Sequence, residues 1–338
     1  MSYVFGTPGD AGLMPPPVKP QAPLLQEAGM ASDPNGCLVI GNYKDESGMK
    51  TLDHTGVTVF DENAVRIYDV KHKNNNEAVK HISFADGNVL ASTRSALFLA
   101  DHARPDAPTV VGWKHVNNIS ITDDRGAVVC DVNSIWALDT RVDNAKGKLF
   151  VTDTASSSIA VKTDDGKQYL LYCSFKNGLV SVMDLEASMI LPGSPVCIGP
   201  LTHADTADSK YPPMVDALAY DDGRILVSVL HNAAVSFAVL DGLRTSEIQV
   251  SMRGCIEQDP SELRPWTSAK LVISDGLEGI ALCDNARLRI FDLNNKTQVY
   301  CRDDVDAYAR NASVVQHAAM ANRDGSVTHA IFGEEDEC

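Results

Sequence analysis

Cysteine and histidine could in principle ligate a metal or act as nucleophile and base, but their spacing in this sequence supports neither role. The eight cysteines form no C-x-x-C pair, and no group of cysteine and histidine has the short spacing of a zinc site. The G-x-S-x-G, H-E-x-x-H and phosphate-loop motifs are also absent. Several cysteines, such as Cys130 and Cys283, lie inside apolar runs, which indicates buried thiols in a reducing compartment. We therefore expect no enzymatic activity, no cofactor and no bound metal.

Charge and composition exclude further classes of protein. The 338 residues include 29 Lys and Arg against 45 Asp and Glu, which gives a net charge of −16. This acidity argues against a protein that binds the phosphate backbone of nucleic acids directly. No window approaches the roughly 18 apolar residues of a membrane-spanning helix, so we expect no membrane segment, and we expect no signal peptide. With 44% hydrophobic residues the chain can bury a core.

Short turns rich in Asp and Gly recur along the chain and predict where strands reverse direction. Asp and Gly favour the positive backbone dihedral φ that hairpin turns require. The glycines of neighbouring turns are 39 to 57 residues apart. The six turns are residues 85–87, 123–126, 164–166, 221–223, 274–276 and 323–325.

The same strand pattern accompanies each turn. An apolar strand follows the turn, and after a small polar loop comes a second strand that usually ends on Asp. A further apolar run precedes each turn, and another follows most of the Asp-ended strands, so one unit contains four strands. Repeated four-stranded units of this length are typical of the blades of a β-propeller. The Asp-ended strands are therefore third in their four-stranded units. They end on Asp69, Asp101, Asp139, Asp184, Asp241 and Asp292.

We predict an all-β chain that folds as a single seven-bladed β-propeller with four-stranded antiparallel blades. Residues 35–332 would form the propeller, with the segment CLVIGNY as the innermost strand of the first blade. The proline-rich residues 1–34 would form an arm. The last blade lacks its outer strands, and the arm contains two candidate short strands, residues 3–5 and residues 24–25. We expect the arm to supply the missing outer strands and to close the ring. Residues 333–338 would be an acidic, solvated tail.

The Asp-ended strands resemble the WD-repeat family in degenerate form, because pairs such as Tyr68-Asp69 stand where that family has Trp-Asp. Two neighbouring segments, LFLADHARPDAPTVVG around Asp101 and SIWALDTR around Asp139, resemble one subgroup more closely. That subgroup comprises the mitotic-checkpoint propeller called budding uninhibited by benzimidazole and its mRNA-export relative. Both are single seven-bladed propellers of about this length.

The resemblance implies a function in protein binding. Members of the subgroup hold a GLEBS peptide, an acid-containing segment of a larger partner, across the top face of the ring. The family pattern places on this face the loops between second and third strands and the loops that lead into each new blade. In this sequence these loops collect cations and tryptophan, which suits an acidic, partly apolar peptide. The candidate partner-binding residues are Lys71, Lys73, Arg94, Trp113, Lys114, Lys176, His231 and Asn232.

We therefore predict a non-catalytic WD-repeat scaffold that forms a heterodimer with a checkpoint-kinase-like partner. The resemblance implies a kinetochore and spindle-checkpoint component of the cell cycle, located in the nucleus at the kinetochore or nuclear pore, or otherwise in the cytoplasm. The alternatives are an mRNA-export or nuclear-pore propeller and a propeller subunit of a vesicle coat or ribosome-assembly complex. An alternative of another class is a metal-dependent propeller hydrolase or lactonase, with Asp216, Asn232, Asn285 and His317 at the central channel.

Overall fold

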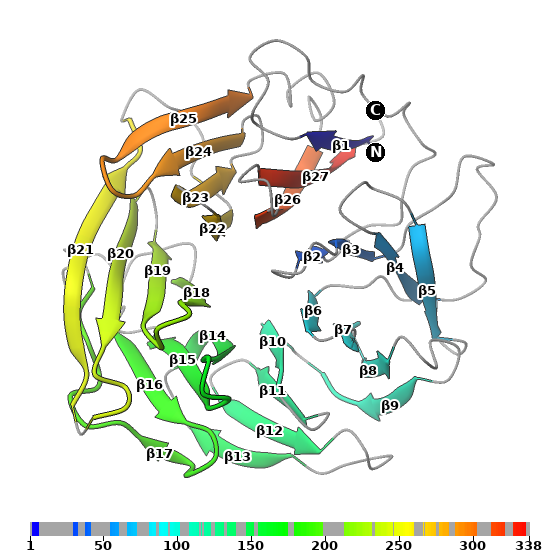
Figure 1. Ribbon diagram of the computed structural model, residues 1–338. Coiled ribbons are helices and arrows are strands. Elements are labelled where there is room, and N and C mark those ends of the chain that lie inside the picture. Colours follow the sequence, from blue (N-terminus) through cyan, green and yellow to red (C-terminus); the bar gives the residue numbers. More distant parts are fainter. Residues whose placement is uncertain are drawn as a thin grey trace. The chain divides into compact units, whose positions relative to one another are not determined.

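In the computed structural model, every regular element of the described part of the chain is a β-strand (Figure 1). The chain divides into two compact units. Unit 1 consists of Met1–Lys114, Val142–Asn144 and Trp266–Cys338, and unit 2 consists of His115–Arg141 and Ala145–Pro265. The structure describes residues 2–6, 30–32, 38–41, 55–60, 66–72, 81–85, 88–93, 95–101, 108–114, 116, 118–122, 126–131, 134–139, 147–151, 155–174, 179–198, 213–231, 234–245, 247–259, 266, 268–274, 277–283, 288–302, 312–321 and 327–335.

Unit 1 contains three four-stranded sheets and one three-stranded sheet among its described residues. Neighbouring strands are antiparallel throughout. The four-stranded sheets are β2 (Met30–Ser32), β3 (Leu38–Gly41), β4 (Thr55–Phe60) and β5 (Arg66–His72); β6 (His81–Ala85), β7 (Asn88–Ser92), β8 (Ala96–Asp101) and β9 (Thr109–Gly112); and β22 (Ser268–Ser274), β23 (Leu277–Cys283), β24 (Leu288–Asp292) and β25 (Thr297–Arg302). The three-stranded sheet consists of β26 (Ala312–Ala321), β27 (Val327–Glu335) and β1 (Ser2–Gly6).

Unit 2 contains three further four-stranded antiparallel sheets among its described residues. As in unit 1, the strands of each four-stranded sheet lie side by side in the order of the sequence (Figure 1). The sheets are β10 (Asn118–Ile121), β11 (Gly126–Cys130), β12 (Ile135–Asp139) and β13 (Lys148–Val151); β14 (Ala155–Lys162), β15 (Gln168–Ser174), β16 (Val180–Asp184) and β17 (Met189–Ile190); and β18 (Met214–Ala219), β19 (Ile225–His231), β20 (Ala234–Asp241) and β21 (Gln249–Glu257). The predicted all-β fold of four-stranded antiparallel units is confirmed.

The two ends of the sequence meet in one sheet of unit 1. β1 pairs with β27 in an antiparallel register that sets Tyr3 opposite Phe332. The N-terminal segment therefore supplies one strand, the third, to the last sheet. β27 continues to Glu335, so the first residues of the predicted acidic tail belong to this strand.

The first sheet differs from the prediction by one strand. The segment predicted as its innermost strand contains β3, which is second in the sheet, and Met30–Ser32 of the predicted arm forms the first strand, β2. As a consequence β5, which contains Tyr68-Asp69, is the fourth strand rather than the third. The pattern was misassigned because three consecutive residues of a proline-rich segment give no recognisable periodicity.

Aspartate ends the third strand in the other four-stranded sheets, and in two of them its carboxylate supports the turn that follows. Asp184 Oδ1 accepts a hydrogen bond from the N–H of Ala187 at 2.9 Å. Asp292 Oδ1 accepts from the N–H of Asn294 at 2.8 Å. A short side chain that bonds to the backbone two or three residues ahead is the usual reason for Asp at this position of a turn.

Two of the Asp-Gly turns have the predicted conformation. Gly166 and Gly223 have φ of 82° and 85°, the left-handed region in which glycine is favoured. Each turn is closed by paired backbone hydrogen bonds, such as Gly166 N–H to the Thr163 carbonyl at 2.9 Å. The tight reversal sets the register of β14 against β15. The register in turn decides which side chains of the two strands lie together on the core side of the sheet.

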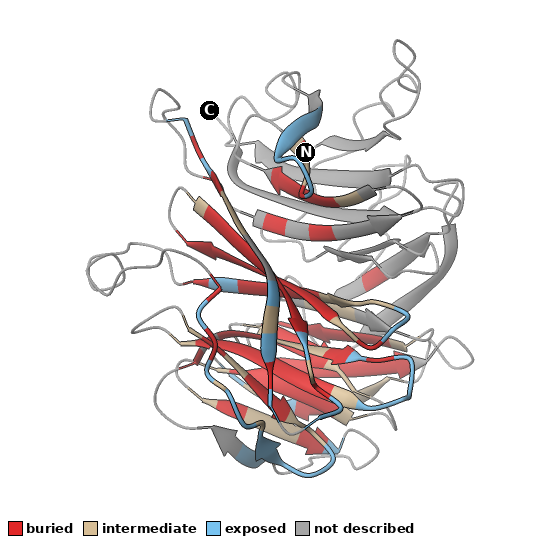
Figure 2. Ribbon diagram, turned by 60° about the vertical axis from the view of Figure 1, so that its left-hand side comes forward, coloured by how far each residue is buried: buried red, intermediate tan, exposed pale blue. Residues whose placement is uncertain are grey.

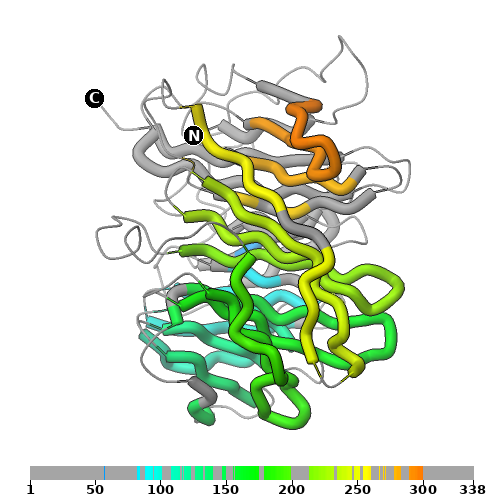
Figure 3. The backbone as a smooth tube through the Cα atoms, turned by 90° about the vertical axis from the view of Figure 1, so that its left-hand side faces the viewer, coloured from blue at the N-terminus to red at the C-terminus, as the bar shows by residue number. Residues whose placement is uncertain are grey.

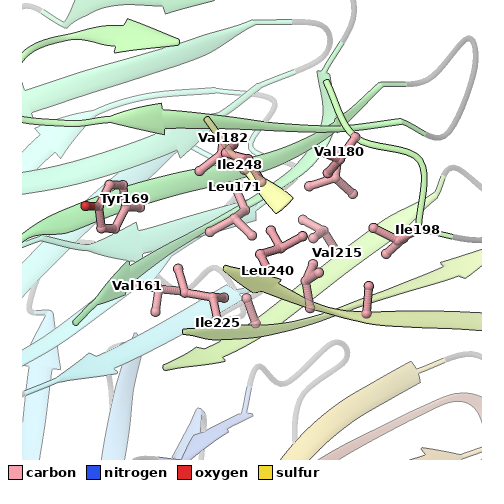
Figure 4. Close-up of a cluster of buried hydrophobic side chains, with 14 of the residues drawn as sticks. Val161, Tyr169, Leu171, Val180, Val182, Ile198, Val215, Ile225, Leu240 and Ile248 are labelled. Carbon is pink, nitrogen blue, oxygen red and sulfur yellow. The ribbon is translucent and has the colours of Figure 1, made fainter. Parts of the chain in front are cut away.

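A core fills the space between two neighbouring sheets of unit 2 (Figure 4). Alternate residues of β14–β16 and of β18–β20 contribute to it, as the period of two in a strand requires. Leu171 and Leu240 in this cluster are both fully buried, and truncating such a leucine typically costs about 2–5 kcal/mol. Figure 2 shows the corresponding buried interiors of the strands and the exposed turns. This core holds the strand ends, and with them the loops, in fixed positions.

Candidate protein-binding site

A buried threonine closes the turn between β7 and β8. Thr93 is 1% exposed, and its N–H donates to the carbonyl of Ala96 at 2.8 Å. The Thr93 hydroxyl oxygen also accepts hydrogen bonds from the N–H groups of Ala96 at 3.1 Å and Ser95 at 3.3 Å. Because one side chain satisfies two backbone donors, the turn has a defined shape. Arg94, the predicted cation of this loop, lies outside the described residues.

Trp113 lies directly beside this turn. Its backbone N–H donates to the carbonyl of Ser95 at 3.0 Å, which extends the pairing of β8 and β9 beyond Ala96 and Gly112. The Trp113 side chain is half-buried and Lys114 is exposed. The structure thus brings an aromatic side chain and a cation of the predicted site to the end of this sheet, next to the β7–β8 turn. We refer to Thr93, Ser95, Ala96, Trp113 and Lys114 as the Trp113 edge.

The other predicted partner-binding residues are not part of this arrangement. Lys71 is in β5 of the same unit, with its side chain outside the described residues. His231 is the last residue of β19 in unit 2 and is only 3% exposed, so it presents almost no surface to a partner. Lys73, Lys176 and Asn232 lie outside the described residues.

The corresponding turn between β11 and β12 in unit 2 is built differently. Asp131 Oδ1 accepts from the N–H of Ser134 at 3.2 Å, and its Oδ2 accepts from the indole N–H of Trp136 at 2.7 Å. The backbone N–H of Asp131 donates to the Ser134 carbonyl at 2.9 Å. Sequence reasoning did not select Asp131 or Trp136. The available signal was an Asp at the first position of a tight turn, which predicts a carboxylate that bonds to the backbone ahead of it.

Cys130, which precedes this turn, has the properties of a structural thiol. Its pKa is raised to about 12, first by burial and then by the negative charge of Asp131. A thiol of this kind is protonated at neutral pH and is a poor nucleophile. Cys173 is also buried, as the apolar run around it predicted, whereas Cys197 is exposed.

Two turns of unit 2, residues 164–166 and 221–223, are acidic in sequence. Figure 3 traces the backbone of this unit from green to yellow. Arg244 forms ion pairs with Asp164 and Asp165, with 3.4 Å between its Nε and Asp165 Oδ2. The hydroxyl of Thr163 donates to Asp165 Oδ1 at 2.7 Å. This hydrogen bond, and with it the Lys167 N–H and the Arg244 charge, holds the pKa of Asp165 below its ordinary 3.8. The arrangement links two neighbouring sheets at the surface.

Within the described ranges, no group of three or more histidine, cysteine, aspartate or glutamate side chains could hold a metal ion. Asp216 is buried in β18 of unit 2, His317 is in β26 of unit 1, and Asn285 lies outside the described residues. The same part of the chain contains no helix long and apolar enough to cross a membrane.

Solved structures identify the fold. The sequence matches no protein-family profile and no curated protein. The β-propeller domain of Cps50 (Swd1) from Myceliophteria thermophila is similar over 93% of this chain and 97% of that chain, with a TM-score of 0.62 and 10% identity. The protein Hsv2 from Kluyveromyces lactis, in a form with loop 6CD replaced by a Gly-Ser linker, is similar over 91% of this chain and 90% of that chain, with a TM-score of 0.55 and 12% identity. These neighbours are WD40 β-propellers, and the chain has the β-propeller fold.

Proposed function

We propose that this protein is a non-catalytic β-propeller platform that binds a short acidic, partly apolar segment of a larger protein at the Trp113 edge. The observation that carries the proposal is the hydrogen bond from the Trp113 N–H to the Ser95 carbonyl. It fixes an aromatic residue and the exposed Lys114 against the loop that contains Arg94. Trp113 and Lys114 thereby belong to the same end of one sheet as Ser95.

The physical case for binding lies in the type of side chain at this edge. Tryptophan and arginine are the residues that most often contribute large binding energies at protein interfaces. The protein as a whole has a net charge of −16, so cations gathered at one edge differ in sign from most of its charge. Such local cations favour a partner segment with acidic side chains. Trp113 would bury an apolar side chain of the partner, and Lys114 and Arg94 would pair with its carboxylates. We extend the same role to Lys71, Lys73 and Lys176 as a proposal that rests on the sequence alone.

The finer identity of the partner rests on the sequence resemblance between residues 95 and 145. On that basis we propose a GLEBS-like segment of a checkpoint-kinase-like protein, bound in a heterodimer at the kinetochore or nuclear pore. An mRNA-export propeller, a vesicle-coat subunit and a ribosome-assembly subunit are the other assemblies in which such a platform would serve. Identification of co-purifying proteins separates these four.

The test is affinity purification of the tagged full-length protein, followed by mass spectrometry. The variant carries Trp113→Ala and Lys114→Glu. A matched control carries Val299→Ala and Lys296→Glu, which makes similar changes to exposed residues of β25 and its turn in the same unit. Circular dichroism checks that both variants are folded.

We expect the control to retain a partner that contains an acidic segment and the Trp113 variant to lose it. Equal recovery by both folded variants would overturn the proposal. Metal analysis of the same preparation tests the competing class of function. Stoichiometric Ca²⁺ or Zn²⁺ would favour a metal-dependent hydrolase over a binding platform.

A further inference from the structure

A second exposed apolar site lies on the outer strand of a sheet in unit 2. β17 is the last strand of its sheet and consists of Met189 and Ile190 alone. The exposed fractions of these two side chains are 61% and 50%. We refer to these two residues as the β17 edge. Among the described residues β17 pairs only with β16, so its other side is an open edge in this part of the chain. Open edges are the places where sheets accept an additional strand.

The hydrogen-bond pattern shows which backbone groups are available there. In an antiparallel pair, opposed residues alternate between exchanging hydrogen bonds and exchanging none. Leu191 donates to the carbonyl of Val182 at 2.9 Å, and the next opposed pair is Met183 and Ile190. The N–H and C=O groups of Ile190 therefore point away from β16, toward the open edge.

The chain beyond β17 restricts the edge to this one position. The segment after Leu191 turns at Pro192–Gly193 and comes back to β16, where Val196 exchanges hydrogen bonds of 2.8 and 3.0 Å with Val180. Between these points the Ser194 hydroxyl oxygen accepts from the N–H of Val182 at 2.8 Å. The chain after Leu191 thus returns to β16, and Ile190 is the residue of β17 whose backbone groups face outward.

Two exposed glutamates lie near the β17 edge. Glu186 lies three residues before Met189 and is exposed. Glu247, also exposed, lies next to the turn after β17, because the N–H of its neighbour Ile248 donates to the Pro192 carbonyl at 3.1 Å. The nearby cation Arg244 is already paired with Asp164 and Asp165. An extended segment that binds here meets carboxylates at both ends.

We propose that the β17 edge accepts an extended segment of a partner protein in which basic residues alternate with apolar ones. The partner's backbone would pair with the N–H and C=O of Ile190, and its apolar side chains would cover Met189 and Ile190. Its Lys or Arg residues would face Glu186 and Glu247. A second copy of this chain fits less well, because it would bring the same carboxylates and a further net charge of −16 to the interface. This site is independent of the Trp113 edge, which belongs to unit 1.

The experiment measures fluorescence anisotropy of a labelled short peptide of alternating lysine and valine, titrated with the full-length protein. The central variant is Ile190→Pro, which removes the outward N–H but no hydrogen bond to β16, as proline on an edge strand allows. We expect at least about tenfold weaker binding by this variant. We expect about threefold weaker binding by Glu186→Lys. Val299→Ala, at an exposed residue of the outer strand β25, is the matched control and should bind as wild type does.

Two further peptides make the result independent of how the variants fold. With wild-type protein, N-methylation of alternate peptide amides should abolish binding, because it removes the donors of strand pairing. Replacement of lysine by glutamate should abolish it as well. Absence of saturable binding, or equal binding of the N-methylated peptide, would overturn the proposal. A protein dimer that Ile190→Pro dissociates would assign the edge to a second copy and would likewise overturn it.

Discussion

Two turns that occupy the same place in their sheets, one between β7 and β8 and one between β11 and β12, use tryptophan differently. In the second turn the carboxylate of Asp131 binds the indole N–H of Trp136 and thereby fixes that side chain. In the first, the hydroxyl of Thr93 binds only backbone groups, and Trp113 is attached through its own backbone N–H to Ser95.

The acceptor in each turn distinguishes the two tryptophans. A carboxylate in the turn recruits the indole into the fold, because a charged acceptor forms the stronger hydrogen bond. In the β7–β8 turn the Thr93 hydroxyl bonds to the backbone, and the backbone N–H of Trp113 attaches that residue to Ser95. We infer that Trp136 contributes to stability and that Trp113 contributes to partner binding.

The largest expected effect is on binding at the Trp113 edge. Trp113→Ala should weaken the purified complex by about 30-fold, as is typical of a hot-spot tryptophan. Trp136→Phe, which removes the indole N–H with part of the ring but keeps an aromatic side chain, should leave affinity unchanged. Isothermal titration with the identified partner segment measures both. If Trp136→Phe weakened binding as much as Trp113→Ala, the distinction between the two tryptophans would fail.

The next effect is on stability at the β11–β12 turn. Asp131→Ala removes the acceptor of both Ser134 and Trp136 and should lower the free energy of unfolding by about 2 kcal/mol. Asp131→Asn, which keeps one carbonyl acceptor, should recover part of the loss. Urea unfolding measures the difference. An unchanged midpoint for Asp131→Ala would show that the Trp136 contact is incidental.

A smaller loss of stability is expected at the β7–β8 turn. Thr93→Ala removes a neutral acceptor from two backbone donors and should cost about 1 kcal/mol. Thr93→Ser keeps the hydroxyl and should cost less. Partner affinity should fall with Thr93→Ala, because Ser95 positions Trp113, and should be retained with Thr93→Ser. A stable Thr93→Ala protein with full affinity would separate the turn from the site.

The smallest effect concerns a third turn, Thr163–Lys167, in which a hydroxyl and a carboxylate act together. The pKa of Asp165 lies below 3.8 in the folded state, first because of the hydrogen bond from Thr163. Its contribution to stability is therefore present above about pH 3.8 and is lost as the pH falls through the lowered pKa. Carboxyl chemical shifts in an NMR titration should show this, and Thr163→Val should return the pKa toward 3.8. An ordinary pKa in the wild type would contradict the account.

Much of the fold was predictable because the repeat is expressed in local chemistry. Asp-Gly turns and Asp-ended strands each have a backbone reason, seen at Gly166, Gly223, Asp184 and Asp292. The sequence pattern indicated the segment that contains β3 as the start of the first sheet and missed β2, because β2 has only three residues. Whether such a segment pairs is decided by the sheet it meets, and not by its own sequence.

The candidate site was predictable in residue type but not in geometry. Trp113 and Lys114 were selected because loop tryptophan and cations suit an acidic peptide. Their attachment to Ser95 depends on the register of β8 and β9, which the sequence does not specify. The roles of Asp131 and Trp136 were missed because a side-chain hydrogen bond between them requires the turn to be formed first.

The central claim, that the Trp113 edge contacts a partner, is tested most directly by site-specific photo-crosslinking. Lys114, which is exposed, is replaced by p-benzoyl-phenylalanine in the full-length protein, and Lys296, also exposed, is replaced in a control. After irradiation in cells, mass spectrometry identifies the adducts. The account predicts a partner crosslinked through an acidic segment at position 114 and absent at position 296. No adduct at position 114, or the same adducts at both positions, would contradict it.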